Sequence, residues 1–164
     1  LPPFIVPVAV THLTKPSDLI RIVELARCTT LQIQDVVTPD DIAEVREALP
    51  YLRIMKAVHV MGESAIATAK YFSDTADAIL LDTRTADRIG GTGITHDWNI
   101  SAKIVKECSC PVILAGGLTP ENVTEAIIRG RPYAVDVHTG VKKNGVRDAE
   151  RTRAFVANAR IARD

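Results

Sequence analysis

The sequence has little that would attract polyanions, cross a membrane or form disulfides. Its 20 basic residues balance 20 acidic ones, so no net charge favours nucleic acid or an anionic membrane as partner. No apolar run approaches the roughly 18 residues that a membrane-spanning helix needs. Cys28, Cys108 and Cys110 are an odd set at uneven spacings, unlike a disulfide framework. We therefore expect a reduced, cytoplasmic protein that binds neither nucleic acid nor a membrane.

Common nucleotide and metal motifs are also missing. Residues 90–93 (Gly-Gly-Thr-Gly) do not form a G-x-G-x-x-G segment after a first strand, and no G-x-x-x-x-G-K-[ST] segment occurs. The spacings of the four histidines match no known zinc signature. The sequence thus favours neither a dinucleotide site nor a metal site.

Six apolar, β-branched runs recur along the chain, and segments with helical periodicity lie between them. The runs predict strands near 5–10, 30–34, 53–58, 78–82, 111–115 and 133–137. The helical segments include 17–26 after Pro16, a helix opening at 38–41, another opening at 119–122, and 148–162. Strict alternation predicts parallel strands with right-handed crossovers.

The length of the chain and the spacing of its apolar runs distinguish between two architectures. With 164 residues, 46% of them hydrophobic, the chain has room for one domain over 1–164. The alternatives are the open doubly wound sheet and the closed (β/α)8 barrel, whose units average about 31 residues. The spacing of the runs favours an α/β fold of the (β/α)8 TIM-barrel type.

Polar residues and glycines stand where several strands end, which is the working face of such a barrel. Residues 115–119 (Ala-Gly-Gly-Leu-Thr) and 138–141 (His-Thr-Gly-Val) suit a phosphate held by backbone N–H groups, or are simply tight turns. Asp82 ends a buried run, and a half-buried carboxyl suits a general acid, although aspartate also caps helices. For Asp136, orienting substrate and bracing its loop are equal alternatives.

The histidines gather at the same end of the predicted strands. His12, His59 and His138 fall at or just after strand ends, which suggests a base, an acid or a phosphate ligand. His96 lies in a loop, and we interpret it as a surface histidine or one hydrogen-bonded within the core.

Four segments in order closely resemble phosphoribosylanthranilate isomerase of tryptophan biosynthesis. They are 80–83 (Leu-Leu-Asp-Thr), 90–93 with Asp97 and Trp98, 114–123 (Leu-Ala-Gly-Gly-Leu-Thr-Pro-Glu-Asn-Val), and 134–137 (Ala-Val-Asp-Val) with Gly140 and Val141. Residues 1–4, 31–33 and 56–58 also fall where that family has similar segments. The resemblance therefore spans essentially the whole chain.

The resemblance implies an isomerase that needs no cofactor. In such an enzyme N-(5-phosphoribosyl)anthranilate undergoes an Amadori rearrangement to 1-(2-carboxyphenylamino)-1-deoxyribulose 5-phosphate. The family's general acid corresponds to Asp82. Its substrate and phosphate contacts carry over to the glycine loops and the residues beside them, namely Gly91, Gly93, Gly116, Gly117, Asp136, His138, Thr139 and Gly140.

Departures from the family pattern concern the base and the first units. Aligned through its opening Leu-Pro-Pro, the chain starts at the family's third strand, so it carries six of eight βα units. The segment with the family's cysteine base is not among its residues, and His12 is the nearest substitute. We expect little isomerase activity from this chain alone unless His12 takes that role. The alternative is a diverged or non-catalytic sugar-phosphate-binding barrel.

The two outer strands should also differ from those of a closed barrel. We expect the strands near 5–10 and 133–137 not to pair with each other, and to expose Val6, Val8, Val135 and Val137. A homodimer or another edge-completing partner would cover such edges.

Overall fold

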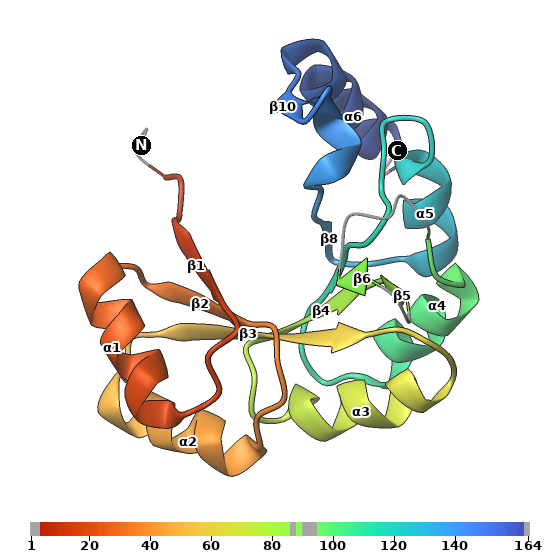
Figure 1. Ribbon diagram of the computed structural model, residues 1–164. Helices are drawn as coiled ribbons and strands as arrows, with labels where there is room; N and C mark the ends of the chain where they lie inside the picture. Colours follow the sequence, from red (N-terminus) through yellow and green to blue (C-terminus); the bar gives the residue numbers. More distant parts are fainter. Residues whose placement is uncertain (1–3, 86–87, 90–94, 163–164) are drawn as a thin grey trace.

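One parallel sheet forms the centre of the protein. The computed structural model describes residues 4–85, 88–89 and 95–162. The sheet has six strands in the order β1-β2-β3-β4-β7-β8, and all neighbouring pairs are parallel (Figure 1). The strands are β1 Val8–Thr11, β2 Thr30–Ile33, β3 Arg53–His59, β4 Ala78–Asp82, β7 Val112–Leu114 and β8 Ala134–Val135. The six predicted strands and their parallel order are confirmed.

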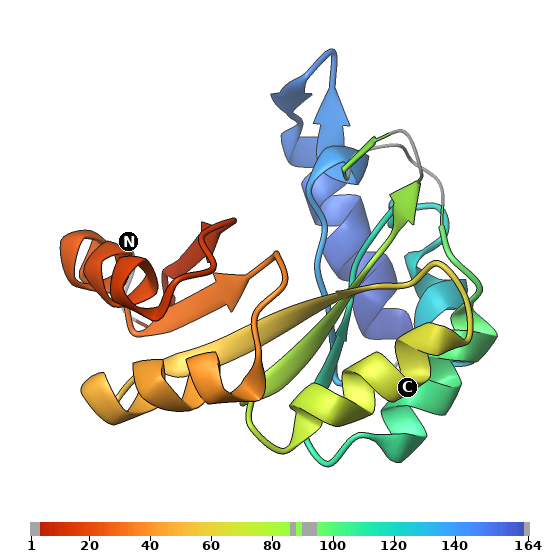
Figure 2. The same ribbon diagram turned by 60° about the horizontal axis from the view of Figure 1, so that its bottom comes forward.

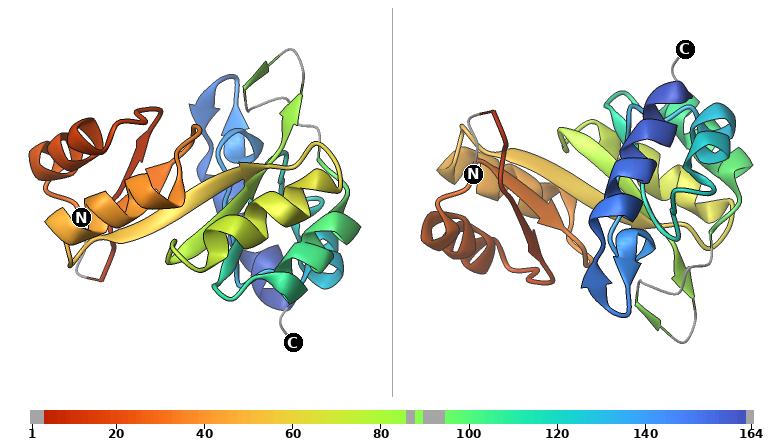
Figure 3. Two further views of the ribbon diagram at one scale, coloured as in Figure 1. Left: turned by 90° about the horizontal axis from the view of Figure 1, so that it is seen from below. Right: turned by 90° about the horizontal axis from the view of Figure 1, so that it is seen from above.

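Helices cover the outer face of this curved sheet, as Figures 2 and 3 show from other sides. They are α1 Pro16–Ala26, α2 Pro39–Ala48, α3 Ser64–Ser73, α4 Trp98–Glu107, α5 Val123–Gly130 and α6 Ala149–Ile161. Local sequence explains several starts. Thr38 and Asp41 form a reciprocal capping box at α2. Asp97 and Asp148 accept backbone N–H groups at the starts of α4 and α6.

Alternate residues of each strand face different surroundings. On β4, Ile79 and Leu81 are fully buried in the core between sheet and helices. Leu80 points the other way and packs with Ala57 and Ala115 on the inner face. Since side chains alternate along a strand, Asp82 lies on the same inner face as Leu80. This alternation places the polar strand ends on the concave side.

The sheet keeps two edges within the described residues. β1 pairs with β2 and β8 pairs with β7, but β1 and β8 are not ladder neighbours, as predicted. Val6 and Val8 are 58% and 40% exposed. The prediction of exposure was wrong for Val135 and Val137, which are half-buried because both pack against the core between sheet and helices.

Two short hairpins extend from the end of the sheet where the parallel strands have their carboxyl ends. One consists of β5 Arg84–Thr85 and β6 Arg88–Ile89, and the other of β9 Lys142–Lys143 and β10 Val146–Arg147. The hairpins lie at the same end of the molecule (Figures 2 and 3). A 3-10 turn, Thr139–Val141, leads from the β8 loop into β9.

The helices give no membrane span. Among the helices of the described ranges, none combines the length and the apolar composition that crossing a bilayer requires.

Candidate active site

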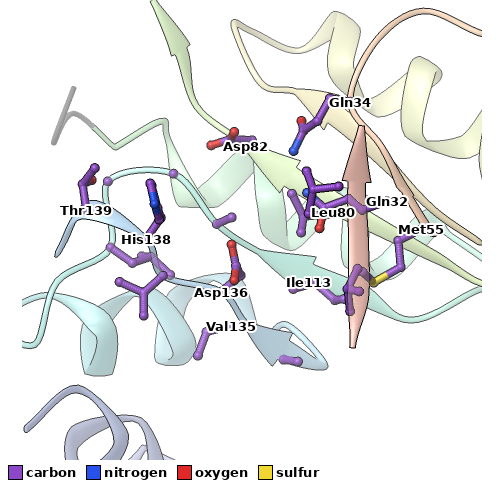
Figure 4. Close-up of a pocket in the computed structure, with 18 of the residues that line it drawn as sticks. Gln32, Gln34, Met55, Leu80, Asp82, Ile113, Val135, Asp136, His138 and Thr139 are labelled. Atoms are coloured by element: carbon purple, nitrogen blue, oxygen red, sulfur yellow. The ribbon is translucent and has the colours of Figure 1, made fainter. Parts of the chain in front are cut away.

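A cavity of about 710 Å³ opens on the concave face of the sheet. Every strand of the sheet contributes to its wall, and polar side chains gather where the strands end (Figure 4). Gln32 and Gln34 come from β2 and the residues after it, and Met55 and Leu80 come from the two central strands. A cavity at the carboxyl ends of parallel strands is the usual place for a ligand in such folds.

Two carboxyl groups face this cavity. Asp82 is the last residue of β4, is half-buried, and accepts the backbone N–H of Thr83 at 2.8 Å. Asp136 follows β8, and Figure 4 shows both side chains directed into the same space. Asp136 is accessible to solvent, but surrounding protein atoms remove much of the water around its carboxyl group. This desolvation, reinforced by the nearby Asp82, raises the pKa of Asp136, while His138 and Arg147 oppose the rise.

The two glycine loops lie against each other beside the cavity. Gly116 and Gly117 have φ of 80° and 67°, a conformation that favours glycine, and both line the cavity. A Cβ on Gly116 would collide with Thr83. A Cβ on Gly140 would collide with the carbonyl oxygen of Leu118. Glycine is therefore required where the loop after β7 meets its neighbours.

An arginine from α6 ties these two loops together. Arg151 donates from Nε to the carbonyl oxygen of Gly140 at 3.0 Å. Its two terminal nitrogens donate to the carboxylate of Glu121 at 3.0 and 3.1 Å, a bidentate pair. Asn122 bridges within the first loop, because its side chain donates to the Gly117 carbonyl and accepts from the Thr119 N–H. The loop geometry is thus braced from behind the cavity.

His12 stands on the opposite wall, just after β1. Its Nδ1 lies 3.1 Å from Oδ2 of Asp35, which follows β2, and both side chains are partly exposed. A carboxylate on one ring nitrogen orients the imidazole and leaves the other nitrogen for chemistry. Spacing along the chain does not reveal this pair, since 23 residues separate its members.

The remaining histidines differ in role. His96 is hydrogen-bonded to Thr83 Oγ1 at 2.8 Å and to Ser101 Oγ at 2.7 Å. Burial lowers its pKa to about 4, with Asp97 opposing, so it is a neutral, satisfied histidine beneath the loop after β4. His138 lines the cavity, and its Nε2 lies 3.0 Å from Nζ of Lys142. His59 ends β3 as predicted.

The structure brings most predicted site residues to one place. The cavity wall includes His12, Asp82, Gly116, Gly117, Asp136, His138 and Thr139. Gly140 lies behind that wall against Leu118, and Gly91 and Gly93 fall outside the described residues. Sequence reasoning missed Gln32, Gln34 and Arg147. The alternation from Gln32 to Gln34 was a usable signal, because residues two apart on a strand share a face.

None of the three cysteines is among the residues described as lining the cavity. Burial, the largest cause, raises the pKa of the Cys108 thiol to about 11, which makes it a poor nucleophile. Among the described side chains, no group of three or more His, Cys, Asp and Glu residues is arranged to hold a metal ion.

Comparison with known proteins gives one consistent family. The profile of the family described as N-(5'-phosphoribosyl)anthranilate (PRA) isomerase matches residues 8–158. N-(5'-phosphoribosyl)anthranilate isomerase 2 of Methanosarcina mazei is 44% identical over 162 residues, which cover 97% of this chain and 72% of that protein.

Comparison with solved structures gives the same family. Phosphoribosyl anthranilate isomerase from Thermotoga maritima superposes with a TM-score of 0.84 at 30% identity, covering 98% of this chain and 75% of that one. An isomerase in complex with reduced 1-(o-carboxyphenylamino)-1-deoxyribulose 5-phosphate matches with a TM-score of 0.80 at 28% identity, covering 98% and 74%. The chain therefore belongs to the N-(5'-phosphoribosyl)anthranilate isomerase family.

Proposed function

We propose that this chain catalyses the Amadori rearrangement of N-(5'-phosphoribosyl)anthranilate, with Asp82 as the general acid. The observation that carries the proposal is the cavity itself, where Asp82 and the glycine loop after β7 share one wall. The reaction itself is inferred from membership of the family. The substrate joins a ribose phosphate to an aromatic amine, and the product is the corresponding open-chain ketose phosphate.

Asp82 acts on the ring oxygen of the ribose. Protonation of that oxygen lets the bond between C1 and the ring oxygen break, and the amine nitrogen takes up the positive charge as an iminium ion. A base then removes the proton from C2, and tautomerisation gives the ketose. The strand end suits the first step, since Asp82 is half-buried and lines the cavity. We assign Asp136, whose pKa is raised, to orienting the sugar hydroxyls.

His12 is our candidate for the base. Its hydrogen bond to Asp35 supports this role, because the carboxylate orients the ring and leaves the other ring nitrogen available. His12→Ala should abolish turnover while leaving the binding of inorganic phosphate unchanged. Normal turnover by His12→Ala would place the base elsewhere.

The glycine loops are our candidate phosphate site. We assign phosphate oxygens to the backbone N–H groups near Gly117 and Gly140, with Gly116, His138 and Thr139 beside them. Gly117→Val should weaken phosphate binding at least tenfold, because a β-branched residue is strained at φ 67°. Gly62→Val is a matched control, since a Cβ there meets no atom within 4 Å. Unchanged phosphate affinity in Gly117→Val would move the site elsewhere.

A non-catalytic sugar-phosphate-binding barrel is the second candidate. It is favoured by the exposure of the His12 side chain, which is 58% exposed where a buried base would be expected. One experiment distinguishes the two candidate functions. Product formation from N-(5'-phosphoribosyl)anthranilate supports the isomerase, and phosphate binding without turnover supports the binding protein.

We also infer what covers the exposed sheet edge and in which compartment the protein acts. The exposed edge at Val6 and Val8 should be covered by further polypeptide, because an open apolar edge aggregates. Sedimentation velocity distinguishes a second copy from other coverage. The free cysteines and the phosphorylated substrate fit the cytoplasm.

A further inference from the structure

Three basic residues cluster beside the glycine loops. We call His138, Lys142 and Arg147 the basic arm. His138 and Arg147 both line the cavity, and Lys142 Nζ lies 3.0 Å from the His138 ring. Asp136 lies on the same wall, and the positive charge of Arg147 acts to lower its pKa.

The hairpin after β8 brings the arm together. Lys142 on β9 and Arg147 on β10 are direct cross-strand partners, so their side chains share one face of the hairpin. Lys143 pairs with Val146 on the opposite face. The connecting residues, Asn144 and Gly145, have φ of 53° and 80°, as a tight two-residue hairpin requires, so the register is well defined.

Two cations directly opposite each other normally destabilise a hairpin. Among the described side chains, neither Lys142 nor Arg147 has a carboxylate within salt-bridge distance. Asp136 is near enough for Arg147 to act on its pKa, but it forms no salt bridge with either cation, so the pair lacks a direct anionic partner among the described residues. A ligand with negative charge would supply one.

The contact between Lys142 and His138 also determines which nitrogen of the imidazole ring accepts a hydrogen bond. A lysine ammonium has three donors and no acceptor, so Nε2 of His138 must accept its hydrogen bond. The ring proton of a neutral His138 then sits on Nδ1. The arm thus offers three kinds of donor to an anion: an imidazole N–H, an ammonium and a guanidinium.

We propose that the basic arm binds the phosphate monoester of the substrate, adding side-chain donors to the backbone site of the glycine loops. Arg147 contacts the anion directly, and Lys142 acts both as a charge and as the residue that positions His138. This assignment rests on the proposed function, because it extends the phosphate site named there. It identifies the preferred ligands as phosphate dianions rather than neutral sugars.

The test measures the affinity of the chain for inorganic phosphate by isothermal titration calorimetry at constant ionic strength. Lys142→Gln and Arg147→Gln should each raise the dissociation constant about 3- to 10-fold, the range for a partly exposed charged hydrogen bond. Lys143→Gln, which removes the same charge from the other face, should change it less than twofold. Lys142→Arg should restore most of the affinity lost in Lys142→Gln.

Two results would overturn the proposal. Equal weakening by all three Gln variants would mean that only overall charge matters. Unchanged affinity in Lys142→Gln and Arg147→Gln would mean that the arm does not touch the anion. Circular dichroism of each variant verifies that it is folded.

Phosphate titration needs no turnover, so it separates this proposal from the proposed function. If the arm variants lose phosphate but the chain converts no N-(5'-phosphoribosyl)anthranilate, the arm stands and the isomerase assignment fails. If Gly117→Val alone loses phosphate, the backbone site stands and the arm fails.

Discussion

Replacing Lys56 by methionine should stabilise the protein at neutral pH. Lys56 lies on β3 with only 4% of its surface exposed, although lysine is almost never buried without a counter-charge. Its Nζ donates to the carbonyl oxygen of Ala57 at 2.5 Å and sits 5.4 Å from the ring centre of Phe72. Removal from water lowers its pKa from 10.5 to about 8, and Asp35 opposes the shift only in part.

The size of the effect follows from that pKa. At about 1.4 kcal/mol for each unit of pKa, keeping Lys56 charged in the folded state costs about 3 kcal/mol at pH 7. Methionine fills a similar volume without charge, but it loses the Ala57 hydrogen bond and the Phe72 contact, which contribute about 0.5 to 1 kcal/mol each. The net expectation is a gain of about 1 to 2 kcal/mol at pH 7.

The dependence on pH gives a sharper test than the single value. The folded pKa of Lys56 lies below the unfolded one, so the unfolded chain binds more protons between pH 8 and 10.5. The wild-type free energy of unfolding should therefore rise through this window relative to Lys56→Met. The advantage of the variant should shrink by about 2 kcal/mol between pH 7 and 10.

Urea unfolding of both proteins at pH 7, 8, 9 and 10 measures this difference, and the subtraction cancels groups common to both. Lys106→Met, on the exposed surface of α4, is the matched control and should run parallel to wild type. If the curves of wild type and Lys56→Met are also parallel from pH 7 to 10, the account of a costly buried charge is refuted.

Two further changes test the packing around the site. His96, whose pKa is lowered to about 4, contributes stability above pH 6.5 that is lost as pH falls toward 4, so His96→Gln should flatten the urea-unfolding profile there. An unchanged acid limb would contradict this. Gly140→Ala should lower the free energy of unfolding by about 1 to 3 kcal/mol, because its Cβ would strike the Leu118 carbonyl. Gly62→Ala, which meets open space, should cost far less, and equal losses would contradict the argument.

The sheet could be predicted because its strands carry their own signal. Buried parallel strands such as β4 read as continuous apolar runs, and Ala78–Asp82 was placed without error. Helix starts at Thr38 and Asp148 were equally local, since each cap lies within a few residues of its partner. The site was partly predictable because parallel strands bring their carboxyl ends to one edge.

What the sequence did not reveal depends on partners far apart in the chain. The His12–Asp35 pair joins two βα units, and the Arg151–Glu121 pair joins α6 to the loop before α5. No periodicity encodes such pairs. The β9–β10 hairpin was not predicted although its Asn-Gly turn is a strong local signal, because its two-residue strands form no long apolar run.

Turnover of N-(5'-phosphoribosyl)anthranilate by the natural protein and its Asp82→Asn variant tests the central claim most directly. Asparagine keeps the shape of the side chain but cannot donate the proton, so kcat should fall about 100-fold or more while KM and phosphate affinity stay within a few-fold. A change confined to KM, or an undiminished kcat, would contradict the assignment of Asp82 as the general acid.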